Sequence, residues 1–136
     1  KRISPTSLRI VVVEDVAATA KSMSTILGLW QHETRTCGDG FSALETIRHF
    51  RPDVVLADLG LPQMSGYQLA EEIRKLPGMD DVVLIAISGY GQPADKERSQ
   101  AAGFRQHLVK PIDPSELEHI LDDLRPAYSK ATARDA

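Results

Sequence analysis

The chain has 136 residues, 42% of them hydrophobic, 26% charged and 5% aromatic, which is enough for one compact domain and too few for two large ones. A total of 16 basic and 19 acidic residues gives a formal net charge of -3, so we expect no direct binding of nucleic acid or of an anionic membrane surface. Cys37 is the only cysteine, which excludes an internal disulfide and favours a reducing, cytoplasmic setting.

The first half of the chain alternates strand-like and helix-like patterns. Residues 8–13 are a continuous apolar and β-branched run, and apolar side chains then recur at helical spacing from Val16 to Trp30. The cycle repeats with a more polar strand, a second amphipathic helix and a fully apolar strand. The patterns predict strands at residues 8–13, 33–37 and 54–57 and helices that begin near Val16 and Asp39.

The second half continues the alternation and marks two helices with capping residues. Ser65 and Gln68 predict a capping box, and Asp113 followed by Pro114 predicts an N-cap with proline in the first turn. The patterns predict helices after Ser65 and Asp113, a polar helix at residues 94–102, and strands at residues 82–87 and 106–109. No apolar run approaches the roughly 20 residues that span a bilayer.

Five strands that alternate with five helices indicate an α/β fold, a doubly wound parallel sheet with helices on both faces. The apolar first, third and fourth strands suit the buried centre and the polar second strand suits an edge, which gives the order 2-1-3-4-5 of a flavodoxin-like (βα)5 domain. We expect this domain to cover residues 8–125. Residues 1–7 are interpreted as a flexible N-terminal stub and residues 126–136 as a flexible tail or linker stub.

Reactive side chains follow four of the predicted strands. Glu14 and Asp15 follow the first strand, Asp58 the third, Ser88 the fourth and Lys110 the fifth. Ligands bind at the carboxyl ends of such strands where the strand order reverses, so we expect these side chains to meet. Three adjacent carboxylates require a counter-charge, and their hard oxygen atoms suit Mg²⁺. With an ammonium and a hydroxyl group they predict a site for phosphoryl chemistry.

The joint spacing of these residues resembles the receiver domain of two-component response regulators, over about residues 8–125. The sequences of these motifs are most similar to those of receivers attached to hybrid histidine kinases. The matching segments are VVVED at residues 11–15, PDVVLADLGLP at residues 52–62 with Gly66, SGYGQ at residues 88–92, and AGF followed by HLVKP between residues 102 and 111.

The resemblance implies that Asp58 is the phosphoacceptor and that a histidine kinase or histidine phosphotransfer protein is the donor. It implies a signalling domain, alone or within a larger hybrid kinase, which catalyses only its own phosphorylation and slow dephosphorylation. Lys110 would bind the phosphoryl group and Ser88 would be the switch hydroxyl. The Mg²⁺ ligands implied by the resemblance are Glu14, Asp15, Asp58 and the backbone carbonyl of Gly60.

Two positions depart from the family pattern. His107 stands three residues before Lys110, where the family usually has an aromatic switch residue, so the moving ring would be an imidazole that titrates near neutral pH. We expect Ser88 and His107 to reposition on phosphorylation and to alter the face formed by the last two helices and the strand between them. A half-exposed strand histidine without a switching role is the open alternative. Glu14 replaces the aspartate that is commoner at the first position of the acid pair, and its side chain is longer.

Two other functions fit the sequence less well. A phosphatase of the haloacid dehalogenase type would need a second acid two residues after Asp58, and Gly60 occupies that position. A degenerate receiver used only for docking would lack one or more of the residues that form the site. All five of the residues that follow the predicted strands are present.

The remaining candidates have structural interpretations. Cys37 is expected to be a packed small hydrophobe, and Trp30 to lie in or near the core. His32, His49 and His119 are expected at or near helix ends or surfaces, and no pair of them has metal-ligand spacing.

Overall fold

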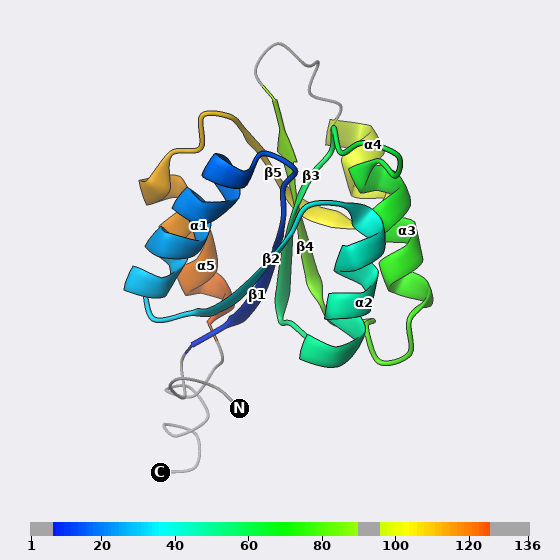
Figure 1. The fold of residues 1–136 in the computed structure, drawn as a ribbon, viewed down its shortest axis with the longest axis horizontal. Helices are drawn as coiled ribbons and strands as arrows, with labels where there is room; N and C mark the ends of the chain where they lie inside the picture. The colour runs from blue at the N-terminus through cyan, green and yellow to red at the C-terminus, as the bar shows by residue number, and fades with distance from the viewer. Residues whose placement is uncertain (1–6, 90–95, 126–136) are drawn as a thin grey trace.

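The computed structural model describes residues 7–89 and 96–125 and contains strands and helices in strict alternation (Figure 1). The strands are β1 Arg9–Val13, β2 Glu33–Cys37, β3 Val54–Asp58, β4 Val83–Ser88 and β5 Phe104–Val109. The helices are α1 Ala17–Leu29, α2 Gly40–Phe50, α3 Gly66–Lys75, α4 Lys96–Ala101 and α5 Pro114–Leu124. The predicted start of the fourth helix at Ala94 lies outside the described residues.

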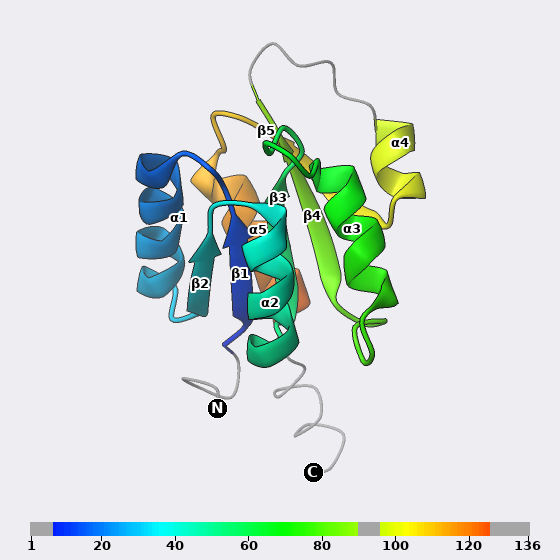
Figure 2. The same ribbon diagram turned by 45° about the vertical axis from the view of Figure 1, so that its right-hand side comes forward.

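All strand pairs are parallel and the sheet order is β2-β1-β3-β4-β5, which confirms the predicted doubly wound topology. Helices α1 and α5 cover one face of the sheet, and α2, α3 and α4 cover the other (Figure 1, Figure 2). The strand order reverses between β1 and β3, so the carboxyl ends of these two neighbours define the switch point of the sheet.

The sheet divides the hydrophobic core into two clusters because successive side chains of a strand point to opposite faces. In β1, Val11 and Val13 belong to the α2–α3 cluster, which also contains Ile47 of α2. Ile10 and Val12 belong to the α1–α5 cluster on the other face. This two-sided burial explains why β1, β3 and β4 have continuous apolar sequences.

The predicted starts of α2, α3 and α5 are confirmed by side-chain caps. Asp39 accepts a hydrogen bond from the Ser42 N–H at 2.8 Å, and Asp113 accepts one from the Ser115 N–H at 2.9 Å. Ser65 and Gln68 form the full capping box at the start of α3. Each cap satisfies backbone donors that the first helical turn leaves without partners.

Strand β5 begins at Phe104, two residues before its predicted start. Leu84 pairs with Phe104 and Ile85 pairs with Gln106, so Arg105 is the extra residue of a bulge. Phe104 is buried, whereas Arg105 and Gln106 are exposed. The bulge breaks the alternation of apolar and polar residues by which a strand is recognised in sequence.

The N-terminal boundary also differs from its prediction. Ser7, which the sequence pattern assigns to the flexible stub, is fully buried, and the N–H of the adjacent Leu8 donates to His32 Nδ1 at 3.0 Å. The rest of the predicted flexible ends, residues 1–6 and 126–136, lie outside the described residues. Within the part of the chain that the structure describes, no helix is both long and apolar enough to cross a membrane.

His32 follows α1, as its sequence position predicts, but it lies in the interior rather than at the surface, with 2% of its area exposed. Burial, and then the charge of Arg125, lower the pKa of His32 to about 4, while the charge of Asp122 opposes them. The neutral ring is therefore the form that folding favours, and its Nδ1 lone pair receives the Leu8 N–H.

Stability is expected to fall between pH 6.5 and about pH 4 because His32 binds a proton more readily in the unfolded chain. The stabilisation from the neutral ring is fully present above pH 6.5 and amounts to about 3 kcal/mol over this window. The variant His32→Asn keeps an acceptor near the Nδ1 position but has no titrating ring. Its free energy of unfolding, measured with urea at several pH values, should therefore depend less steeply on pH than that of wild type. His119→Asn is the matched exposed control, and equal slopes in wild type and His32→Asn would contradict the prediction.

Candidate functional site

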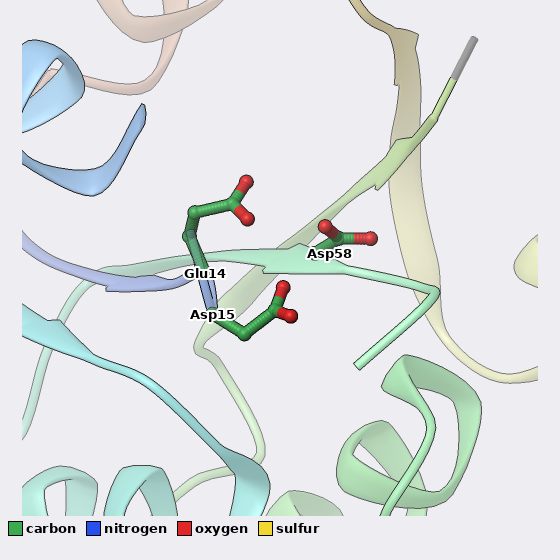
Figure 3. A group of neighbouring side chains, drawn as sticks. All are labelled: Glu14, Asp15 and Asp58. Carbon is green, nitrogen blue, oxygen red and sulfur yellow. The ribbon is translucent and has the colours of Figure 1, made fainter. Parts of the chain in front are cut away.

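The carboxylates of Glu14, Asp15 and Asp58 meet at the switch point of the sheet (Figure 3). Glu14 and Asp15 follow β1, and Asp58 is the last residue of β3. One carboxylate oxygen from each residue lies within 4.8 Å of the others. The predicted convergence of these acids is confirmed, and their hard oxygen atoms form a donor set that fits a small divalent cation such as Mg²⁺.

Lys110, which follows β5, provides the positive charge at this cluster. Its Nζ lies 2.6 Å from Glu14 Oε1 and 3.0 Å from Asp58 Oδ2. Burial alone lowers the pKa of Lys110, but the hydrogen bonds to Glu14 and Asp58 and their charges raise it above the ordinary value. Lys110 is therefore a permanent cation at neutral pH. The peptide bond between Lys110 and Pro111 is cis.

The three acids differ in exposure and in their partners. Asp58 is 7% exposed, and its Oδ1 accepts a hydrogen bond from the Gly60 N–H at 2.8 Å. Glu14 is also buried, and its Oε2 accepts from the Val16 N–H at 3.1 Å. Asp15 is exposed, and among the described residues no hydrogen bond or ion pair involves its carboxylate. Asp15 is thus the acid most available to an incoming cation.

Ser88 is a buried residue at the end of β4, beside the acidic cluster. Asp58 pairs with Ile87, so Ser88 stands one position further along the neighbouring strand. Its hydroxyl Oγ lies 3.0 Å from His107 Nε2, and His107 Nδ1 lies 3.2 Å from the Oγ of Ser99. Sequence reasoning missed Ser99, a residue of α4 that is buried although the helix around it is polar.

The other sequence candidates lie outside this cluster. Cys37 is buried in the α2–α3 cluster, and burial raises the pKa of its thiol, so it packs as a small hydrophobe. Trp30 is partly buried and packs against the α1–α5 cluster. His49 and His119 are exposed on α2 and α5.

A sequence model of the response regulator receiver domain matches residues 10–122, most of the chain. The chain belongs to the receiver domain family. Among curated proteins, this receiver domain is 34% identical over 113 residues to the probable transcriptional regulator ycf27 of Guillardia theta, covering 83% of this chain and 43% of that protein. It is 27% identical over 123 residues to the signal transduction histidine-protein kinase BarA of Escherichia coli K12, covering 90% of this chain and 13% of that protein. The receiver domain therefore spans less than half the length of these relatives.

Solved structures give the same family. The receiver domain of sensor histidine kinase PA1611 from Pseudomonas aeruginosa PAO1 has a TM-score of 0.78 and 28% identity, covering 87% of this chain and 97% of that one. That structure has a magnesium ion coordinated in its active site cleft. The chemotaxis response regulator CheY4 of Vibrio cholerae has a TM-score of 0.80 and 25% identity, covering 88% and 99% of the two chains.

Gly66 lets α3 of this receiver domain approach the end of β3, which carries Asp58, and the loop that follows it. A Cβ on Gly66 would lie 2.8 Å from both the Asp58 carbonyl oxygen and Leu59 Cα, which are backbone atoms. Gly66→Ala should therefore displace the loop and destabilise the fold by about 1–3 kcal/mol. Gly28→Ala is the matched control, because open space surrounds Gly28 in α1 and alanine should stabilise that helix by about 1 kcal/mol. Urea unfolding distinguishes them, and equal free energies of unfolding would show that the close approach is unimportant.

Proposed function

We propose that this receiver domain accepts a phosphoryl group on Asp58 from the phosphohistidine of a histidine kinase or histidine phosphotransfer protein. The observation that carries the proposal is the position of Asp58. Its carboxylate is buried, lies within 4.8 Å of two further carboxylates and is 3.0 Å from the Lys110 ammonium group. This is an acceptor surrounded by the charges that phosphoryl transfer requires.

In the proposed transfer, an oxygen of the Asp58 carboxylate attacks the phosphorus atom of the donor. The new O–P bond forms as the P–N bond breaks, and the electron pair of that bond returns to the imidazole of the donor. Lys110 neutralises charge on the phosphoryl oxygens, and the Ser88 hydroxyl donates a hydrogen bond to one of them. The Gly60 N–H holds the acceptor carboxylate in place throughout.

The proposed metal site uses the same cluster. Asp15, Asp58 and the Gly60 carbonyl would hold Mg²⁺, with Glu14 completing the acidic set. When bound, Mg²⁺ supplies positive charge to the phosphoryl oxygens. The magnesium-containing cleft of the PA1611 receiver supports this assignment.

We assign a signalling role rather than turnover of small phosphoesters. Gly60, two residues after Asp58, offers no side chain that could act as a general acid or base for hydrolysis. The phosphorylated state should therefore persist long enough to be read by a partner. The proposed readout is a rearrangement of Ser88 and His107 that alters the face formed by α4, β5 and α5.

The similarity to one segment of BarA supports a place within, or beside, a larger hybrid kinase. The proposed donors and the single buried cysteine are consistent with a cytoplasmic setting. The negative net charge supports action through protein partners rather than by direct contact with nucleic acid.

The test is intact-mass spectrometry after incubation with acetyl phosphate and Mg²⁺, and separately with a phosphorylated histidine kinase. Each should add one phosphoryl group that is labile in alkali, as an acyl phosphate is, and that peptide mapping locates to Asp58. Chelation of Mg²⁺ with EDTA should prevent the addition. A stable adduct on a serine or histidine would overturn the assignment of Asp58.

A further inference from the structure

The imidazole of His107 lies between two buried hydroxyl groups that come from different elements. Its Nε2 is 3.0 Å from Ser88 Oγ at the end of β4, and its Nδ1 is 3.2 Å from Ser99 Oγ in α4. Both serines are 2% exposed, and the ring itself is half-buried in β5. The three side chains form a continuous line of hydrogen-bonding groups from α4 to the edge of the acidic cluster.

A neutral imidazole in such a line determines the direction in which the hydrogen bonds are donated. One ring nitrogen carries a proton and donates, while the other has a lone pair and accepts. If Nε2 donates to Ser88, then Nδ1 must accept, and the hydroxyl of Ser99 must point its proton at the ring. If Nδ1 donates to Ser99, then Nε2 accepts and takes the proton of the Ser88 hydroxyl.

Only the first direction leaves the Ser88 proton available. A serine hydroxyl has one proton, so a Ser88 that donates to Nε2 presents only lone pairs to a phosphoryl oxygen on Asp58. A Ser88 that accepts from Nε2 keeps its own proton free to donate to that oxygen. The direction of the hydrogen bonds at His107 therefore decides whether Ser88 can donate a hydrogen bond to the phosphoryl group or presents only lone pairs to it.

We infer that Ser99 is a positioning residue, which acts through His107 to aim the Ser88 proton at the phosphoryl group of Asp58. Ser99 donates to Nδ1, this holds the proton of the ring on Nε2, and Nε2–H donates to Ser88. The inference rests on the proposed function for the role of Ser88, but the tautomer of His107 is a property of the unphosphorylated chain as well. A phenyl or phenol ring at position 107 has no pair of nitrogens through which to transmit this orientation.

The inference is tested first by the two-bond ¹H–¹⁵N NMR spectrum of the ¹⁵N-labelled chain at pH 8, where an ordinary imidazole is neutral. His107, assigned with the His107→Phe variant, should be protonated on Nε2. Ser99→Ala should shift its signals toward a mixture of tautomers, and Ser99→Thr should restore them. His32 is the internal reference, because its Nδ1 accepts the Leu8 N–H and neither residue is changed in these variants. Protonation of His107 on Nδ1, or an unchanged tautomer in Ser99→Ala, would overturn the inference.

The second measurement is the rate of phosphorylation by acetyl phosphate and Mg²⁺. Loss of one well-placed hydrogen bond should slow Ser99→Ala about fivefold. Ser99→Thr should recover most of the rate, and Ser115→Ala, an exposed serine of α5, should match wild type. A shifted tautomer with an unchanged rate would refute the link to Ser88. If the wild-type chain is not phosphorylated at all, the proposed function fails, while the NMR spectrum still tests the tautomer.

Discussion

Asp58→Asn is expected to abolish phosphorylation of the chain by acetyl phosphate or by a phosphorylated kinase. The amide is not a nucleophile toward phosphorus, so the loss should be at least about 10³-fold. The substitution is conservative for the fold, because the amide oxygen can still accept the Gly60 N–H that now binds Asp58 Oδ1 at 2.8 Å. Lys110 also retains its second partner, Glu14, at 2.6 Å.

The loss in Asp58→Asn is measured by intact mass, with thermal unfolding as the check on folding. Asp123→Asn, which changes an exposed acid of α5 in the same way, should incorporate one phosphoryl group like wild type. Normal incorporation in Asp58→Asn would move the acceptor to another side chain.

Asp15→Ala is expected to eliminate detectable Mg²⁺ binding, whereas Glu14→Ala should weaken it about tenfold. The two acids differ because Glu14 already has partners on both oxygens, the Lys110 ammonium group and the Val16 N–H. The Asp15 carboxylate is exposed and has no such partner among the described residues. Even in wild type the affinity should be weak, because few protein oxygens bind the cation directly and water must fill the rest of the coordination shell.

Mg²⁺ binding is measured by titration of the unphosphorylated chain, with the amide NMR signal of Gly60 as the local readout. Asp80→Ala removes an exposed acid elsewhere and should leave the affinity unchanged. Undiminished affinity in Asp15→Ala would remove this residue from the direct ligands. A larger loss in Glu14→Ala than in Asp15→Ala would reverse the assigned order.

Most of the site could be predicted because its residues stand at strand ends. A strand such as residues 54–57 is recognised from its apolar run alone, and the parallel topology then brings Asp58 beside the acids that follow β1. Caps such as Ser65 could be predicted for a similar reason, since the residues that form them are three positions apart.

The missed features depend on contacts between distant parts of the chain. His32 is buried because its ring receives the N–H of Leu8, 24 residues earlier, and no local pattern encodes that contact. Ser99 is buried in α4, which also contains the charged residues Glu97 and Arg98. Only its spacing from Ala102, which follows the helix and packs against the α2–α3 cluster, distinguished this side of α4. The start of β5 was missed because the bulge at Arg105 disrupts the period of two.

The sheet separates the α1–α5 cluster from the α2–α3 cluster, so substitutions in the two clusters are expected to change the free energy of unfolding additively. Ile10 and Ile47 are both fully buried, but they lie in different clusters. Ile10→Val and Ile47→Val should each cost about 1 kcal/mol, and in the double variant these costs should add to within about 0.5 kcal/mol. One helical face can therefore change its sequence to suit a new binding partner without disturbing the packing beneath the other.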